Sequence, residues 1–495
     1  MDEVVKRQTP ASTTFSTAKP RKVYEADGRD RALLPAAWGI GVLLVNLFWA
    51  KGLPGFGISL LVFVWYMVLF WYMGPDGLKS RASKLLMGAI GLIALTFSLY
   101  SNLWLRGWNM VALVVLGAIQ LAQWTGIESW AAPSAFPKGI WLLGRGAFGA
   151  LPASMDTVKS IKGDRRLLTV LLGFLLALPL LLLVIPLLVQ ADPYFAIVVE
   201  RLVNGFAQLF GKAVFRLFLG LILVPVHFGL LYSLRHIEKR ESKIFSFPKV
   251  DPLLSTVILL IMDLLYAFFI VVQSTALFGG PAYLERVSGL SYAEYARSGF
   301  FQLVFVAGLN LTLILVALRF GKGEGKQLWL KWLGTVLILE SGLILLSAAY
   351  RMTLYVSVYG LSLKRFLTYW GMAMLTLFFA VALRSVWKEG AAFFKTAFVI
   401  AVTGWLILNY CNVDRCVARY NVAMWRENQS EVIDLTYLTH GLSYDALKEI
   451  EELPGDIQVK WGRLDSLLEG RRREAKKIAS DWRTWSFSAW QAAKG

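Results

Sequence analysis

Two acidic side chains within apolar stretches of this sequence are the residues best suited to chemistry. Asp263 and Glu340 each lie near the middle of such a stretch, where an ionised group facing lipid is unfavourable by a few kcal/mol. At about 1.5 Å of rise per helical residue, both would lie at a similar depth. In contact, they would share a proton or hold a cation, because neighbouring carboxylates disfavour each other's ionisation. Alternatively, each only links two helices, which stabilises membrane proteins by about 0.6 kcal/mol per link.

Four further polar residues fall within apolar stretches and form a second set of candidates. Arg216 and Arg351 lie towards the outer ends of their stretches, where a long basic side chain can extend to water and need have no other role. His227 follows Pro225, whose ring removes a backbone hydrogen bond and can leave a carbonyl free. Asn310 completes this polar set.

A third group of candidates lies in the connection 279–299, between two apolar stretches. On a helix, Tyr292 and Tyr295 would share one face, while Glu294 and Arg297 are spaced to form an ion pair. In a functional role, this segment would form a lid or a docking surface over the bundle. The alternative is an interfacial helix with a surface ion pair.

Established catalytic motifs are absent from the sequence, among them His-Glu-x-x-His, Gly-x-Ser-x-Gly and the phosphate-binding Gly-x-x-x-x-Gly-Lys-Ser/Thr. Residues 144–149 match Gly-x-Gly-x-x-Gly but lack the preceding strand that a dinucleotide site requires. Two cysteines and three histidines predict no disulfide framework and no metal site. We therefore expect no cofactor, and the sequence leans away from an enzyme.

The elements that must position these residues are membrane-spanning helices. Hydrophobic residues make up 57% of the 495 residues and charged residues only 17%, with a mean hydropathy of +0.56, whereas soluble proteins carry about 25% charged residues. The net charge of +18 is concentrated between apolar stretches. It is therefore explained by the preference of basic residues for the cytoplasmic side, and no nucleic-acid partner is expected.

The predicted fold is all-α, a polytopic transmembrane helix bundle of about eleven spans with a small helical soluble C-terminal region. A helix needs about 20 apolar residues to cross a bilayer, and closed backbone hydrogen bonding makes helices the expected form of such runs. The stretches near that length are 33–50, 58–73, 85–100, 108–124, 167–189, 214–234, 253–278, 300–318, 328–350, 366–383 and 394–411.

Three domains follow from this pattern: a disordered cytoplasmic tail (1–31), a transmembrane helical domain (32–411) and a soluble, mostly helical C-terminal region (412–495). With the N-terminus inside, the cytoplasmic segments hold about 28 Lys and Arg residues and the external loops about 9. This bias predicts a multi-pass protein of the cell membrane. An odd number of spans then places the C-terminus outside the cell.

Several passages of the sequence also carry a family resemblance. They are Ala191–Phe195, Leu277–Gly280, Leu290–Phe300, Tyr350–Tyr355, Ala418–Val422 and Asp434–Leu438. Together these passages resemble a bacterial membrane family known as domain of unknown function 4173, over roughly residues 165–450. Where that family has Asn-Pro-Asp, this chain has Asn412-Val413-Asp414. Because the family has no assigned activity, the resemblance implies the fold and no mechanism.

Three functional hypotheses remain open at this point. The leading one is a non-enzymatic envelope scaffold, sensor component or assembly factor that contacts lipid and reaches an envelope protein through its C-terminal region. The second is a secondary transporter that uses Asp263 and Glu340. The third is an intramembrane enzyme acting on a lipid or lipid-linked substrate, with Arg216, Arg351, Glu294 or Arg297 around an outer cleft, where cations would hold a phosphate.

Overall fold

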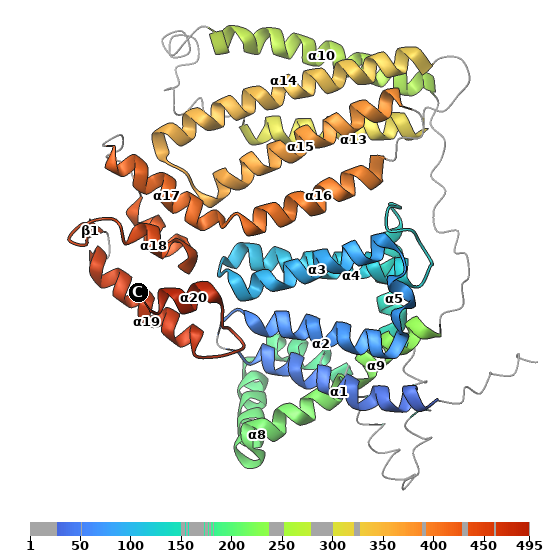
Figure 1. Ribbon diagram of the computed structural model, residues 1–495, viewed down its shortest axis with the longest axis vertical. Helices are drawn as coiled ribbons and strands as arrows, with labels where there is room; N and C mark the ends of the chain where they lie inside the picture. Colours follow the sequence, from blue (N-terminus) through green and yellow to red (C-terminus); the bar gives the residue numbers. More distant parts are fainter. Residues whose placement is uncertain are drawn as a thin grey trace, which may run out of the picture.

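The computed structural model describes residues 27–50, 52–149, 183–236, 252–278, 300–320, 327–388, 393–427, 434–459 and 462–494, with a few positions between 154 and 181. These residues are almost entirely helical. Long helices run side by side across the molecule, and the C-terminal region lies against one end of them (Figure 1).

Apolar helices confirm the predicted all-α polytopic fold. The bundle helices are α1 (Gly28–Phe48), α2 (Phe56–Met73), α3 (Arg81–Leu99), α4 (Leu103–Trp124), α5 (Ala135–Gly149), α8 (Pro193–Ile222), α9 (Val224–Arg235), α10 (Pro252–Phe278), α13 (Phe300–Phe320), α14 (Gln327–Tyr359), α15 (Leu363–Trp387) and α16 (Phe393–Tyr410). Within the described ranges, eight of these are long and apolar enough to cross a membrane, and a bent pair formed by the end of α8 and by α9 would make a ninth. A shorter apolar helix covers 301–317. The predicted stretch 167–189 lies mostly outside the described residues, so the total of eleven stays a prediction.

The bundle helices form two packed groups that α16 joins. In the first group, α10, α13, α14 and α15 share a buried apolar core. In the second, α1, α2, α4 and α9 enclose another core, to which α3 and α5 add their own contacts. Helix α16 packs against α15 on one side and α3 on the other, as Figure 1 shows. Large apolar side chains such as Phe268 and Phe305 remain exposed on the outside of the bundle, as expected of a surface that faces lipid.

Charged groups fasten the end of the bundle at which α1 begins. Asp27 and Asp30 form a capping box that accepts the first backbone N–H groups of α1. The Arg235 guanidinium, at the end of α9, lies 2.7 Å from the Asp27 carboxylate and 3.3 Å from that of Asp30. The Tyr72 hydroxyl, at the end of α2, donates to Asp30 at 2.6 Å. Helices α1, α2 and α9 therefore meet at one polar cluster.

The opposite end of the bundle is covered by the C-terminal region, and we call its described residues 412–427, 434–459 and 462–494 the C-terminal cap. Its elements are α17 (Val413–Arg426), the π-helical turn η2 (Tyr437–Gly441), the 3-10 turn η3 (Tyr444–Ala446), α18 (Leu447–Ile450), a two-stranded antiparallel hairpin β1 (Gln458–Val459) and β2 (Gly462–Arg463), α19 (Leu464–Ala479) and α20 (Phe487–Ala492). A buried apolar cluster unites these elements with Leu105 of α4 and Leu408 of α16.

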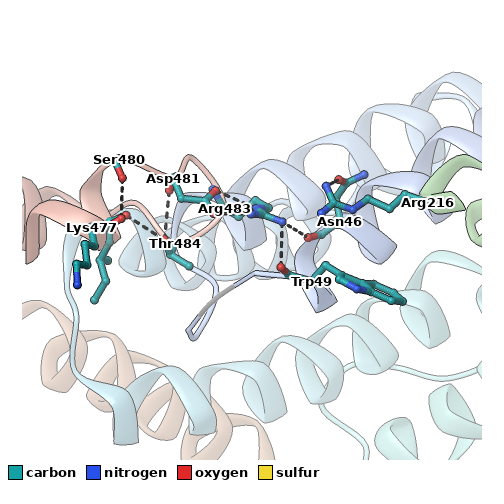
Figure 2. Close-up of polar contacts among 9 residues, drawn as sticks. Asn46, Trp49, Arg216, Lys477, Ser480, Asp481, Arg483 and Thr484 are labelled. Carbon is teal, nitrogen blue, oxygen red and sulfur yellow. Dashed lines mark hydrogen bonds and ion pairs between the residues drawn. The ribbon is translucent and has the colours of Figure 1, made fainter. Parts of the chain in front are cut away.

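Backbone hydrogen bonds attach the cap to the connection between α1 and α2. The Gly55 and Phe56 amides each donate at 2.8 Å to carbonyls of the cap, those of Arg483 and Trp485. A Cβ at Gly55 would lie 2.1 Å from the Trp485 carbonyl oxygen, so only glycine permits this approach. Figure 2 shows Arg483, held by Asp481, reaching the Trp49 carbonyl at 3.1 Å. The cap is therefore fixed to the ends of the spans.

Candidate functional site

A cavity of about 530 Å³ lies where the cap meets the end of the bundle. Its bundle wall comes from the α1–α2 connection and from residues 101–106, and its cap wall from Asp414, residues 440–444, Arg471 and the 478–484 segment. The volume falls within the range of pockets that hold small molecules, about 300–1,000 Å³. We call this space the cap cavity.

Asp414 is the buried acid of the cap cavity. It lies in the first turn of α17, behind Asn412, whose side chain caps the helix by accepting from the Arg415 amide. Its side chain is 2% exposed. The Oδ2 atom accepts hydrogen bonds from Asn102 Nδ2 at 2.8 Å and from the Ser443 amide at 3.0 Å. Its Oδ1 atom is buried and has no hydrogen-bond partner among the described residues.

Burial governs the protonation of Asp414. Loss of hydration raises the pKa of its carboxyl group, against hydrogen bonds from Ser443 and Asn102 that lower it, and the nearby Asp445 raises it further. A buried acceptor without a partner is rare in folded proteins and requires an explanation. A ligand donating a hydrogen bond from the cavity would satisfy this Oδ1 atom.

A second carboxylate, Asp445, joins the connection between α3 and α4 to the cap. Its Oδ2 atom accepts from the Ser101 amide at 2.8 Å, from the Ser101 hydroxyl at 3.0 Å and from the Ser443 hydroxyl at 2.7 Å. In return, the Ser101 hydroxyl accepts from the Tyr444 amide at 3.1 Å. These bonds close one side of the cavity. They occupy the Oδ2 atom of Asp445, which therefore has a structural role.

Arg106 is a buried cation that backbone carbonyls hold in place. Its guanidinium donates to the Tyr100 carbonyl at 2.7 and 3.0 Å and to the Phe97 carbonyl at 3.0 Å. These carbonyls belong to the last turn of α3 and its cap, where a positive charge is favourable. Asn102, the N-cap of α4, accepts from the Leu105 amide and sets the start of the helix that carries Arg106. The side chain thus fixes the α3–α4 corner that forms the bundle wall.

Aromatic rings and a second arginine complete the cavity. The Arg471 guanidinium lies over the Tyr444 ring, 4.8 Å from its centroid, and donates to the Leu442 carbonyl at 2.8 Å. Its buried Nε atom has no partner among the described residues. Trp104 also lines the cavity and keeps 43% of its surface exposed. A donor at Arg471, an acceptor at Asp414 and two aromatic faces therefore meet in one space.

A second cavity, of about 570 Å³, adjoins the first beyond Tyr444. Charged side chains of both signs line it, including Arg415, Lys448 and Glu451. Arg415 is already paired with Glu449 at 2.7 Å, and Glu451 with Arg472 at 2.8 Å. Because Arg415 and Glu451 already have ion-pair partners, the cap cavity is the stronger candidate site.

Three of the six intramembrane residues predicted from the sequence come together in the first group of helices. Asp263 of α10 and Glu340 of α14 interact electrostatically, and Asn310 of α13 donates to Ser341 beside Glu340 at 2.9 Å. All three side chains are buried.

The other three predicted residues lie apart from this cluster. Arg216 of α8 donates to the Asn46 side chain at 3.0 Å (Figure 2). His227 bonds with its ring to the Leu223 carbonyl at 3.0 Å, at the break before α9. Arg351 is buried in α14, in the first group of helices and eleven positions after Glu340. Arg216 and Arg351 therefore lie on helices with different neighbours, since α8 packs against α1, and α14 against α10, α13 and α15. The outer cleft of the enzyme hypothesis stays a prediction. The loop candidates Tyr292, Glu294, Tyr295 and Arg297 lie outside the described residues.

The fold and the cavity together define a multi-pass α-helical membrane protein with a capped cavity at one end of its bundle. A sequence profile described as "Domain of unknown function (DUF4153)" matches residues 87–453, most of the chain, and the protein belongs to this family. This finding corrects the resemblance to family 4173, although both are families of unknown function. No curated protein and no solved structure matches the chain. The matched region contains Ser101, Arg106, Asp414 and Asp445 but ends before Arg471.

Proposed function

We propose that this protein is a non-enzymatic receptor of the cell envelope, a sensor component that binds a small polar ligand in the cap cavity. One observation carries the proposal: Asp414 lines the cavity, and its buried Oδ1 atom has no hydrogen-bond partner among the described residues. A buried polar group in that state is satisfied when a bound molecule donates to it. Arg471 also lines the cavity, and its buried Nε atom is a donor without a partner among the described residues.

The expected ligand follows from the groups that line the cavity. It carries a hydroxyl or ammonium donor for Asp414 and an acceptor for Arg471, and it has a face that packs against Trp104. Small polyhydroxy compounds such as sugars combine these features. Hydrogen bonds to charged groups are worth about 1.5–3 kcal/mol each, which suffices for selectivity between similar solutes.

Binding is favoured over catalysis by the arrangement of His440. This side chain and two serines line the same cavity as Asp414, a composition that an acyl-transfer enzyme would also use. A nucleophile, however, must lie within hydrogen-bond reach of its base. In the described part of the chain, Nδ1 of His440 bonds to the neighbouring Thr439 hydroxyl at 2.9 Å. The Ser101 and Ser443 hydroxyls bond to Asp445 instead, and within these described residues neither forms a hydrogen bond with the second ring nitrogen, Nε2.

The cap cavity faces the outside of the cell in this proposal. The cap lies at the end of the bundle opposite the start of α1. Segments assigned to the cytoplasm hold about 28 Lys and Arg residues against about 9 in the external loops, and this bias places the start of α1 inside. The N-terminus is then cytoplasmic and the C-terminus extracytoplasmic.

A sensor component also requires a partner that receives its signal. The exposed residues of α19 include the basic Arg473, Lys476 and Lys477, which outnumber its exposed acids Glu469 and Glu474 in the same turns. We expect this basic face to contact an acidic surface of an envelope protein, while the spans contact only lipid and other helices. No nucleic acid takes part in this proposal.

Thermal unfolding of the full-length protein in lipid nanodiscs tests the ligand class. The probes are neutral sugars, amino sugars, linear polyols and amino acids, each added in excess. At least one should raise the Tm of the wild type, because a ligand that binds only the folded state stabilises it. The Trp104→Ala variant should lose most of this shift. Trp482→Ala is the matched control, since Trp482 is 44% exposed and lies outside the residues that line the cavity. A panel that leaves the wild-type Tm unchanged contradicts the proposal.

A further inference from the structure

Several side-chain oxygen atoms that accept no hydrogen bond from the described residues are buried within the first group of helices. Asp263 is 6% exposed, Glu340 8% and Asn310 0%. Both carboxylate oxygens of Asp263, Oε2 of Glu340 and Oδ1 of Asn310 are buried and have no hydrogen-bond partner among the described residues. Helices α10, α13 and α14, which carry the three side chains, pack against one another.

The orientation of Asn310 is fixed by the hydroxyl beside it. Ser341 donates its only hydroxyl hydrogen to the Leu337 carbonyl at 2.7 Å, so it can only accept from Asn310. The Asn310 amide must therefore present its NH₂ group to Ser341, at 2.9 Å. Its Oδ1 atom is left as an acceptor. The same reasoning excludes the flipped amide, which would bring two acceptors together.

The three side chains are close enough to act as one group. Asp263 and Glu340 interact electrostatically. The Tyr266 hydroxyl contacts Asn310 and also lies within electrostatic range of Glu340. Two carboxylates within electrostatic range of each other, in a medium of low dielectric constant, disfavour each other's ionisation, and a cation bound with them relieves this repulsion.

Basic side chains on the described parts of the neighbouring helices are not placed to supply that cation. Among the described residues of α14, Lys331 precedes Glu340 by nine positions and Arg351 follows it by eleven, which is about 13 and 16 Å along the helix axis. On α15, which packs against α13 and α14, Lys364, Arg365 and Arg384 lie near the helix ends. Tyr266 is the remaining titratable group beside the pair.

The geometry points to an intramembrane site, formed by Asp263, Glu340 and Asn310, that holds one monovalent cation, either a proton or Na⁺. A proton would be shared between the two carboxyl groups. Sodium would be bound by the carboxylate and amide oxygens, the ligand type that hard cations prefer. This site lies in a different group of helices from the cap cavity, and it does not depend on the receptor function.

Thermal unfolding of the full-length protein in nanodiscs tests this site directly. Wild type and the double variant Asp263→Asn with Glu340→Gln are compared at pH 6 and pH 8.5, in sodium chloride or choline chloride. The wild-type Tm should rise with Na⁺, or with protons when Na⁺ is absent, by about 3 °C or more, and the double variant should lose this response. The matched control, Glu469→Gln with Glu474→Gln, removes two exposed acids of α19 and should respond like the wild type.

A bound proton and a bound sodium ion give distinct results in this experiment. A response to Na⁺ at constant pH identifies a sodium site, whereas a response to pH that Na⁺ leaves unchanged identifies a proton site. Equal responses in wild type and the double variant overturn the proposal.

A second measurement covers the case in which the double variant does not fold. Dicyclohexylcarbodiimide modifies protonated carboxyl groups within membranes, and mass spectrometry identifies the modified residue. In wild-type protein at pH 6 without Na⁺, Asp263 or Glu340 should be modified. Absence of modification at both residues under these conditions overturns the proposal, because a proton is then the only cation available to the site.

Discussion

The Asn102 amide donates a hydrogen bond of 2.8 Å to the Asp414 carboxylate, although 312 positions separate the two residues in the chain. Asn102 begins α4, and Asp414 lies in the first turn of α17. Each residue thus has a local role at a helix start as well as a shared role in the wall of the cap cavity. Their contact couples the docking of the cap to the acid that we assign to ligand binding.

Removing the Asn102 side chain should lower stability more than the loss of a helix cap alone. Asn102→Ala removes the cap of α4 and leaves a buried carboxylate oxygen with one partner fewer. We expect a loss of roughly 2–4 kcal/mol, about 1 from the cap and about 1–3 from the buried acceptor. Ser80→Ala is the control, because Ser80 caps α3 by accepting only from the Ser83 amide. Chemical denaturation in micelles measures the free energy of unfolding of both variants. Equal losses of stability in Asn102→Ala and Ser80→Ala would refute a role for the Asp414 contact.

Asp414 should make the stability of the protein depend on pH. Burial raises the pKa of its carboxyl group in the folded state above the unfolded value. Protonation therefore favours folding: the stabilisation is fully present below the unfolded pKa and is lost as pH rises through the folded pKa. Asp414→Asn should remove this contribution. The Tm of the wild type minus the Tm of Asp414→Asn should decrease as the pH is raised from 4 to 8. A Tm difference that stays constant or increases with pH would count against this account.

Arg106 should be intolerant of conservative replacement. A lysine keeps the charge but not the planar fork that bonds the Tyr100 and Phe97 carbonyls together. We expect Arg106→Lys to lower the free energy of unfolding by about 1–3 kcal/mol, the cost of a buried group left unsatisfied. Arg426→Lys is the control, since the exposed Arg426–Glu452 pair is worth about 0–1 kcal/mol. If both variants are equally stable, Arg106 does not hold the α3–α4 corner.

Gly55→Ala should loosen the cap from the bundle. The added Cβ would lie 2.1 Å from the Trp485 carbonyl oxygen and 2.5 Å from that of Thr484, so the backbone bonds at this junction must break or shift. A loss of about 1.4 kcal/mol would raise the undocked fraction about tenfold, which limited proteolysis of the cap would detect. Gly91→Ala in α3 meets no atom within 4 Å and should be cleaved at the wild-type rate. If the cap of Gly55→Ala is cleaved no faster than that of Gly91→Ala, the contact between Gly55 and the cap is not as close as described.

Much of the fold could be predicted from the sequence, because lipid leaves helices as the only stable form of long apolar stretches. The ends of the spans were less predictable. Helix α1 begins at Gly28 rather than near Leu33, since the Asp27 capping box satisfies a polar first turn. Helix α14 continues past Tyr350 to Tyr359, because Met352 and Val356, which follow Arg351, are buried in the core of the first group and extend the same helix.

The intramembrane cluster was predictable and the cap cavity was not. Asp263 and Glu340 stand out because a carboxyl group within an apolar stretch is unfavourable in lipid. Asn102, Asp414 and Asp445 are ordinary polar residues at helix starts, and their local pattern predicts caps and turns. Their joint role depends on contacts between a span end near residue 101 and a soluble segment more than 300 positions later. Periodicity and composition carry no information on such contacts.

The most direct test of the receptor account is the accessibility of His440, an exposed residue of the cap cavity. Cys411 and Cys416 are replaced, His440→Cys is introduced, and intact cells are treated with a maleimide that does not cross membranes. Lys494→Cys in the cap and Lys84→Cys at the start of α3 serve as outside and inside controls. The account predicts labelling of His440→Cys in intact cells, at a rate similar to that of Lys494→Cys. Labelling of His440→Cys only after permeabilisation, together with Lys84→Cys, would contradict it, because the cavity would then face the cytoplasm.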